Sequence, residues 1–222
     1  MRKIFSIFFI FLLGTTHLCI AQPLRIWSEL TYNHLLDDQK TDILLQTFIR
    51  AIPDKNTINQ GIQRNMLGYW WTPKWGVYGG YDFVVNTLIG QNRSIHEHRI
   101  LQQLSYRNQW SKTSLEIRSR LEERILDNHT GPQVRLRERA YVTLGSIFNH
   151  HRPVIYDEIF LNFNHQNWGS PRFVDQNRAF LGLLFRLKKQ LVLETGLMHQ
   201  WVTNQQSGQG QKIISVALRY NP

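Results

Sequence analysis

The sequence predicts an all-β fold, specifically an antiparallel transmembrane β-barrel of about 10–12 strands. Three observations indicate this fold. Apolar and polar residues alternate with period two over much of the chain, the alternating segments are long enough to cross a membrane when tilted, and the connections between them are alternately short and long.

The alternation is clearest in residues 113–126, where Leu115 and Ile117 alternate with Glu116 and Arg118. A helix would scatter these side chains around its circumference, whereas a strand separates them onto two faces. Many segments exceed the ~5–6 residues usual in soluble sheets and suit the ~9–11 residues of a tilted membrane strand. The predicted strands are 24–34, 41–52, 58–71, 75–87, 95–110, 113–126, 133–147, 153–164, 173–187, 190–203 and 211–220.

The number of these segments is odd, although single-chain bacterial barrels have an even number of strands. The tight turns are Pro73-Lys74, Ser111-Lys112 and Lys188-Lys189, and longer connections lie between them. If the tight turns and the end of the last strand face the periplasm, the segments from 41–52 to 211–220 form ten strands. We then expect the segment 24–34 to be an extra piece, either a plug or the partner of a twelfth strand.

The first residues predict export from the cytoplasm. Met1-Arg2-Lys3 is cationic, residues 4–13 are almost wholly apolar, and small and polar residues follow as far as Ala21. This is the order of a cleaved secretory signal, and the apolar run is about half the ~20 residues of a membrane-spanning helix. We predict a signal peptide over 1–21 and a single β-barrel domain over 22–222, in a Gram-negative outer membrane. An uncleaved membrane anchor is the alternative.

Charge and cysteine content limit the function further. The formal net charge is +10 and falls to +8 when Arg2 and Lys3 leave with the signal. A basic chain first suggests nucleic acid, but the export signal and the even spread of the charge argue against that partner. Outer-membrane lipid, lipopolysaccharide or a small anionic solute is expected instead. Cleavage also removes Cys19, which leaves no thiol for a disulfide, a metal or catalysis.

In a membrane barrel the polar faces line the interior, so the alternation assigns many charged residues to the lumen. These residues, the lumen charges, are Arg50, Arg64, Glu97, Arg99, Arg107, Glu116, Arg118, Arg120, Glu122, Arg124, Arg135, Arg137, Arg139, Glu158, Arg178, Arg186 and Glu194. We expect neighbouring strands to set Arg beside Glu and so to build a closed, ion-paired core. A pore or anion site lined by the excess arginine is the alternative.

Tryptophan near the tight turns suits an aromatic girdle at the membrane interface. The residues assigned to this girdle are Trp70, Trp71, Trp75 and Trp110. The alternative is that these rings are core aromatics of a soluble β-sandwich.

No catalytic, metal or cofactor site is predicted, so we do not expect an enzyme. Ser105 is assigned to the inward face, whereas His96 and His98 lie on the opposite face of the same strand, which is poor geometry for a nucleophile and its base. The two histidines could offer two metal ligands, but the sequence shows no third. No glycine-rich phosphate loop precedes a helix, so nucleotide binding has no support.

A series of motifs in order along the chain resembles the domain-of-unknown-function family 2490. The motifs are Arg64 with Gly68-Tyr69, Gly79-Gly80-Tyr81, His96-Glu97-His98-Arg99, Gln102-Gln103-Leu104, residues 118–124, Arg135-Leu136-Arg137, residues 156–162 and Asp175-Gln176-Asn177-Arg178. The resemblance implies an outer-membrane β-barrel without an established activity. Such barrels usually end on an aromatic residue read by the barrel-assembly machinery, whereas here Tyr220 is followed by Asn221 and Pro222.

Three hypotheses follow for the function. The first is a non-enzymatic outer-membrane barrel, structural or a narrow pore, with an Arg/Glu-lined interior. The second is an outer-membrane lipid hydrolase, which requires a Ser or Asp with a His near one rim. The third is a soluble periplasmic ligand-binding β-barrel, which requires the apolar faces to point inward.

Overall fold

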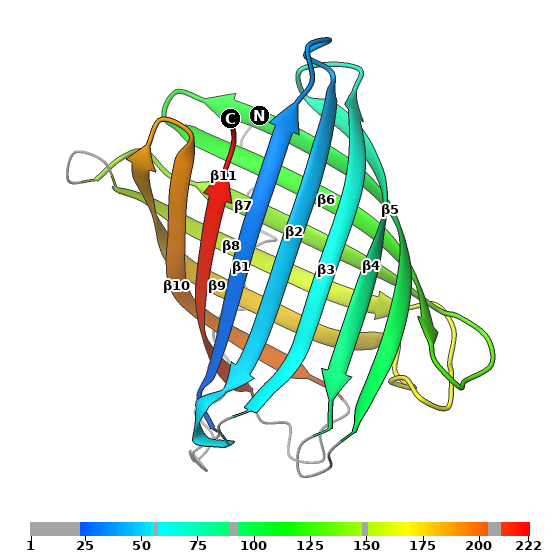
Figure 1. Ribbon diagram of the computed structural model, residues 1–222. Helices are drawn as coiled ribbons and strands as arrows, with labels where there is room; N and C mark the ends of the chain where they lie inside the picture. Colours follow the sequence, from blue (N-terminus) through cyan, green and yellow to red (C-terminus); the bar gives the residue numbers. More distant parts are fainter. Residues whose placement is uncertain (1–22, 56, 89–92, 148–150, 204–209) are drawn as a thin grey trace, which may run out of the picture.

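The computed structural model describes residues 23–55, 57–88, 93–147, 151–203 and 210–222, so the predicted signal peptide lies outside the described residues. The predicted all-β barrel is confirmed: eleven strands form one closed barrel (Figure 1). The strands are β1 (Arg25–Leu35), β2 (Thr41–Ile52), β3 (Thr57–Trp70), β4 (Trp75–Thr87), β5 (Ser94–Trp110), β6 (Thr113–Leu126), β7 (Gln133–Thr143), β8 (His151–Asn162), β9 (Val174–Lys188), β10 (Leu191–Val202) and β11 (Gln211–Tyr220). A short 3-10 helix, Pro53–Lys55, follows β2.

The first strand closes the barrel, which corrects the expectation that residues 24–34 form a plug or pair with a twelfth strand. β1 pairs antiparallel with β2 and parallel with β11, with Trp27 opposite Ser215 and Thr31 opposite Arg219. The arrowheads of β1 and β11 point the same way in Figure 1. All other neighbouring strands are antiparallel, so one parallel seam lets an odd number of strands close.

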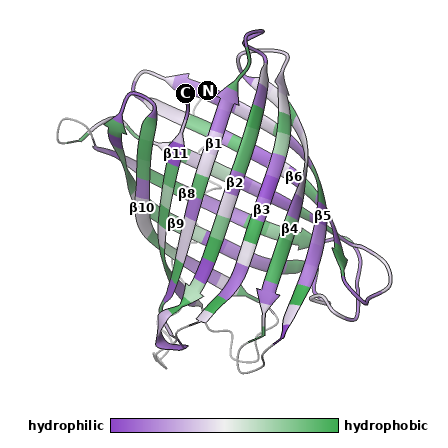
Figure 2. Ribbon diagram, in the orientation of Figure 1, coloured by the Kyte–Doolittle hydropathy of each residue, from purple (hydrophilic) through white to green (hydrophobic). Residues whose placement is uncertain are grey.

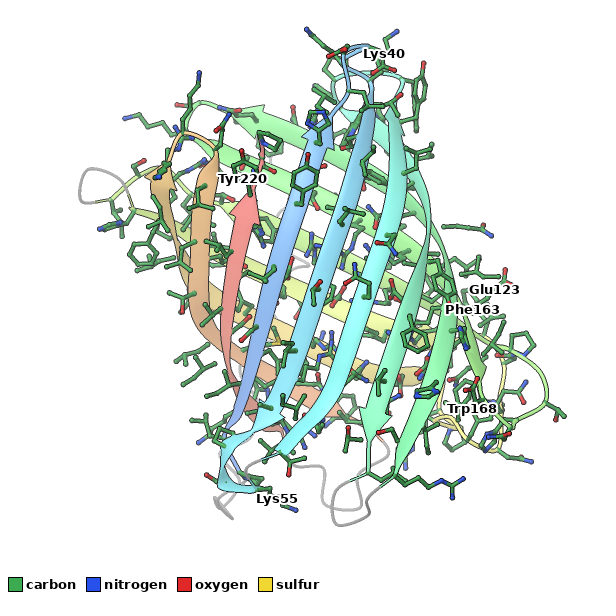
Figure 3. All side chains as sticks on the ribbon, viewed as in Figure 1. Lys40, Lys55, Glu123, Phe163, Trp168 and Tyr220 are labelled. Carbon is green, nitrogen blue, oxygen red and sulfur yellow. The ribbon has the colours of Figure 1, made fainter. Side chains whose placement is uncertain are left out.

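The period-two pattern sorts the side chains between the interior and the outer surface. Leu181 and Leu197, on the outer face, are 62% and 69% exposed, whereas Arg120 and Glu122, on the inner face of β6, are 1% and 0% exposed. Figure 2 shows the alternation of hydrophobic and hydrophilic residues along the strands, and Figure 3 shows side chains projecting from the outer wall. This arrangement is the reverse of a soluble barrel, in which apolar side chains fill the centre.

The two ends of the barrel differ. The turns between β1 and β2, β3 and β4, β5 and β6, and β9 and β10 lie at one end, together with the end of β11, and we call this end the short-turn mouth. At the opposite, long-loop mouth, the connection between β8 and β9 packs against the strands. Asn162 Nδ2 donates hydrogen bonds to the carbonyl oxygens of Ser170 and Arg172 at 3.2 and 3.1 Å, which holds this loop at the rim.

Part of the interior is apolar and tightly filled. A buried cluster joins five strands, and its members are Tyr141, Val154, Phe180, Met198 and Ile213. A Cβ added at Gly182 would lie 2.5 Å from the ring of Phe180, so the absence of a side chain on β9 makes room for that ring. No helix of the described chain is long and apolar enough to cross a membrane.

Candidate functional site in the barrel interior

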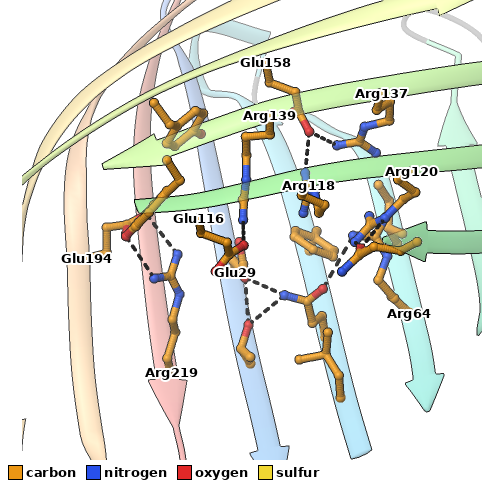
Figure 4. A pocket seen from close by; sticks show the side chains of 18 of the residues that line it. Glu29, Arg64, Glu116, Arg118, Arg120, Arg137, Arg139, Glu158, Glu194 and Arg219 are labelled. Carbon is orange, nitrogen blue, oxygen red and sulfur yellow. Dashed lines mark hydrogen bonds and ion pairs between the residues drawn. The ribbon is translucent and has the colours of Figure 1, made fainter. Parts of the chain in front are cut away.

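Glu158 is the carboxylate shared by the largest number of arginines in the interior. It lies on β8, is 3% exposed, and accepts a hydrogen bond from Arg137 of β7 at 2.9 Å and another from Arg118 of β6. Its second oxygen lies 3.5 Å from Arg178 of β9. Four successive strands therefore meet at one carboxylate, and Figure 4 shows two of these ion pairs. Neighbouring strands are only ~4.8 Å apart, so a long arginine side chain can reach across one strand to a carboxylate on the next.

A second shared carboxylate lies on β6. Glu122 accepts hydrogen bonds from Arg135 and Arg137, both at 2.6 Å. Arg135 also lies 3.3 Å from Asp175 of β9. Arg137 thus bridges Glu122 and Glu158, and the two carboxylates belong to one continuous network.

Further pairs extend this network around the wall. Arg64 donates two hydrogen bonds to Asp82, both at 2.7 Å, which is the bidentate geometry that a guanidinium favours. Glu97 accepts a hydrogen bond from Arg99 at 2.8 Å and also pairs with Arg124.

Two more pairs join β6 to β7 and β10 to β11. Arg139 donates to Glu116 at 2.8 Å, and Arg219 donates to Glu194 at 3.1 Å (Figure 4). Tyr141 also donates its hydroxyl to Glu194. These pairs are only partly buried, since the side chains of Glu116 and Arg219 are 42% and 26% exposed, so breaking them should cost less than breaking the fully buried pairs.

Arg120 differs from these arginines, because its hydrogen-bond acceptor is a neutral amide. Its Nε donates to Oε1 of Gln103 at 2.8 Å, and its Nη2 contacts the same oxygen. Nη2 also lies 3.8 Å from the sulfur of Met66. Among the described residues, no carboxylate lies within 4.0 Å of Arg120 and its Nη1 has no hydrogen-bond partner.

The interior encloses a cavity of about 280 Å³, and it is strongly basic. Its charged lining residues are Arg50, Arg64, Arg99, Arg118, Arg120, Arg137, Arg139, Arg178 and Arg219, with Glu29, Glu116, Glu158 and Glu194. Several of these guanidinium groups find their carboxylates outside the lining, for example Arg64 at Asp82 and Arg137 at Glu122. The space is large enough for a small ion with several waters, since one water occupies about 30 Å³ in the liquid.

The structure places most of the sequence-assigned lumen charges inside the barrel, but Arg107 and Arg186 are exceptions. Both are exposed at the short-turn mouth, because β5 and β9 continue past the enclosed part of the barrel. Arg107 stacks 3.9 Å above the ring of Trp70 and donates Nε to the carbonyl oxygen of Pro73 at 2.8 Å. The expectation that these two arginines belong to the paired interior is therefore corrected.

Trp70 is also corrected, because it points into the barrel and is only 8% exposed. It lies six residues after Arg64 on β3, and an even separation on a strand puts two side chains on the same face. Its Nε1 donates to Asp42 at 3.2 Å and to the hydroxyl oxygen of Tyr78 at 3.0 Å. A Cβ at Gly76 would lie 2.6 Å from this ring, so glycine makes room for it beneath the short-turn mouth.

The other tryptophans assigned to the girdle lie on the outer surface. Trp71, Trp75 and Trp110 are 45%, 39% and 53% exposed. Trp71 stacks on Trp75 with ring centroids 6.5 Å apart, and Trp75 contacts Tyr106 at 4.7 Å. These rings form a group next to the short-turn mouth.

Several interior residues escaped the sequence analysis. Asp82, Gln103 and Arg219 are on the inner faces of β4, β5 and β11, and period-two counting along those strands would have found them. Phe160 broke the alternation of its segment. It is fully buried, and the guanidinium carbons of Arg137 and Arg178 lie 4.5 and 4.4 Å from the centre of its ring, so one aromatic ring contacts two guanidinium groups.

The residues weighed for catalysis are not brought together. Ser105 lies inside the barrel, where Gln103 donates to its hydroxyl oxygen at 2.9 Å. His96 and His98 lie on the outer face of β5, each 3.3–3.4 Å from a carboxylate oxygen of Asp127. The wall of the barrel separates the hydroxyl from the imidazoles. Within the described ranges, no group of three His, Cys, Asp or Glu residues is arranged to hold a metal ion.

Comparison with known proteins gives a family but no activity. The model of a family described as "Protein of unknown function (DUF2490)" matches residues 24–211. An uncharacterised protein of Methylorubrum extorquens is 27% identical over 154 residues, which cover 68% of this chain and 67% of that protein. No solved structure matches the chain.

Proposed function

Since the chain belongs to the DUF2490 family, whose function is unknown, we propose on its side-chain arrangement that it is an outer-membrane β-barrel with an ion-paired interior. The observation that carries this proposal is the inverted distribution of polarity: leucine, isoleucine and aromatic side chains cover the outside, and buried arginine and glutamate line the inside. Such an outer surface is unfavourable in water, because its apolar side chains would be exposed to solvent. It is favourable in a membrane, where the same side chains contact lipid tails.

The strand lengths support the same setting. The eleven strands have between 10 and 17 residues, and a tilted transmembrane strand needs about 9–11. The exposed Trp71, Trp75 and Trp110 beside the short-turn mouth suit one interfacial girdle. Tyr220, the outward aromatic residue that ends β11, suits recognition of the last strand by the barrel-assembly machinery during insertion.

We propose that the interior of the barrel is largely filled by side chains, and that the barrel is not an open pore. Shared carboxylates tie neighbouring strands together, and the buried ring of Trp70 is among the side chains that fill the interior near the short-turn mouth. Barrels of eight strands are filled by side chains and those of 16–18 strands leave a channel, so eleven strands fit either state and the side chains decide. The ion-paired filling predicts little ion conductance.

The two other hypotheses gain no comparable support. A soluble ligand-binding barrel requires apolar side chains inside, whereas here Leu181 and Leu197 are among the most exposed residues. A lipid hydrolase requires a nucleophile beside a base, whereas Ser105 and His98 lie on opposite sides of the wall.

The proposal is tested by cell fractionation together with heat modifiability on a gel. We expect the mature protein in the outer-membrane fraction and a change of mobility between unboiled and boiled samples, because a closed barrel resists detergent until it is heated. Recovery of the protein in the soluble periplasmic fraction, without a mobility change, would contradict the proposal.

A further inference from the structure

We propose that the interior cavity is a binding site for one small oxoanion, of the phosphate or carboxylate class, and that Arg120 is its principal ligand. The inference concerns the lumen chemistry and rests on the closed barrel proposed above. Its starting point is the cavity lining, in which nine arginines face four glutamates.

Pairing removes most of this excess charge but leaves two lining arginines, Arg50 and Arg120, without a carboxylate partner among the described residues. Arg50 is half-buried and stacks on the ring of Trp27, whereas Arg120 is fully buried. Asp82 neutralises Arg64, and Glu122 and Glu158 hold Arg137 between them. Arg120 meets two neutral acceptors, the amide oxygen of Gln103 and the sulfur of Met66. An isolated buried charge is strongly unfavourable unless a counter-charge accompanies it.

The surroundings of Arg120 strengthen the case for an anion. Each of the like charges on Arg64, Arg118 and Arg137 acts on it more strongly than the opposite charge on Glu122. Figure 4 shows Arg64 and Arg120 next to each other. An oxoanion in the cavity would be attracted by several guanidinium groups at once. Its several oxygens could accept the charge-assisted hydrogen bonds for which arginine is suited.

Unpartnered donors are present in the same place. Nη1 of Arg120 and the Nε groups of Arg118, Arg137 and Arg139 are buried and have no hydrogen-bond partner among the described residues. A guanidinium has five N–H donors and no acceptor, so only acceptor atoms can satisfy it. The unpartnered donors therefore need oxygen acceptors, and the positive charge of the guanidinium groups favours oxygens that belong to an anion.

The neutral side chain of Gln103 leaves the positive charge of Arg120 to be balanced by a bound anion. Its amide nitrogen donates to Ser105 at 2.9 Å, which fixes the amide with its oxygen toward Arg120. A glutamate at this position would supply a permanent carboxylate, as the interior does for Arg64, Arg135 and Arg137. With glutamine there, the compensating charge has to come from a ligand.

The decisive variant is Gln103→Glu, because it should fold at least as stably as the wild type while occupying Arg120 internally. The folded barrel in a non-ionic detergent is titrated with inorganic phosphate by calorimetry, against sodium chloride of equal ionic strength. We expect phosphate binding to the wild type and an affinity at least about tenfold lower in Gln103→Glu, since the phosphate then loses its charge-assisted hydrogen bonds from Arg120. Arg120→Gln should show the same loss.

Arg124→Gln is the matched control. Arg124 is an interior arginine that pairs with Glu97 and does not line the cavity, so its loss should leave phosphate affinity unchanged. Equal phosphate affinity in all four proteins, or no binding by the wild type, would overturn the inference. A wild-type barrel that stays heat-modifiable but does not bind phosphate would refute the anion site alone, whereas a soluble protein without heat modifiability would refute the proposed function.

Discussion

Replacement of Glu158 by glutamine should destabilise the barrel more than any other single loss of an interior charge. The glutamate receives Arg118 and Arg137 on one oxygen and lies 3.5 Å from Arg178 through the other. Glutamine keeps the volume but removes the negative charge, so three buried guanidinium groups lose a shared partner. Removing one partner of a buried pair costs about 3–5 kcal/mol, and the sharing by three arginines favours the upper part of that range.

The measurement is equilibrium unfolding in urea of the barrel folded in detergent, followed by the unboiled band on a gel. Glu123→Gln is the control, because Glu123 lies on the outer face of β6 (Figure 3) and takes no part in the interior network. We expect a clear fall in the urea midpoint for Glu158→Gln and little change for Glu123→Gln. A Glu158→Gln barrel with the midpoint of the wild type would refute the claim that ion pairs hold the interior together.

Three further outcomes follow. Trp70→Ala should raise single-channel conductance in planar bilayers, because it removes a large ring from the interior near the short-turn mouth. Conductance equal to that of the wild type would mean that Trp70 does not restrict the lumen. Leu181→Arg should destabilise the folded barrel in lipid vesicles by ~2–4 kcal/mol if residue 181 lies near the bilayer midplane, and an unchanged free energy of unfolding would argue against lipid contact there. Hydrogen bonds from the Thr41 hydroxyl and from nearby backbone N–H groups lower the pKa of Asp38 in the turn between β1 and β2. The stability that Asp38 contributes is therefore present above the ordinary pKa of an aspartate and is lost as the pH falls through the lowered value. Asp38→Asn should flatten the acid side of the curve of stability against pH, and a curve identical to that of the wild type would show that this turn contributes nothing.

Much of the wall could be predicted because its pattern is local. Inward and outward faces follow from period two alone, and Glu116, Arg118 and Arg120 fall on one face of β6 wherever the strand pairs. The same counting, applied along β3 from Arg64, would have placed Trp70 inside. The error came from assigning Trp70 by its nearness to a turn and not by its parity.

Partners across the barrel could not be predicted, because they depend on register and closure. The pairing of Arg219 with Glu194 follows from the register of β10 and β11. The closure of the barrel by β1 could not be predicted either, because β1 and β11 lie at opposite ends of the chain and no turn connects them. The neutral partner of Arg120 depends on the alignment of β5 and β6, in which Gln103 lies opposite Arg120.

The central claim, that the apolar face meets lipid and the charged face is enclosed, is tested most directly at two neighbouring residues of β10. Cleavage at the predicted site would leave the mature chain without cysteine, so Leu197→Cys and Met198→Cys can each carry a single spin label. Leu197 is 69% exposed on the outer face, and Met198 is 6% exposed on the inner face. In lipid vesicles we predict that the label at 197 is readily relaxed by oxygen, which concentrates in lipid, and poorly by a water-soluble nickel complex, while the label at 198 is shielded from both. Strong relaxation of the label at 197 by the nickel complex would place the apolar face in water and contradict the account.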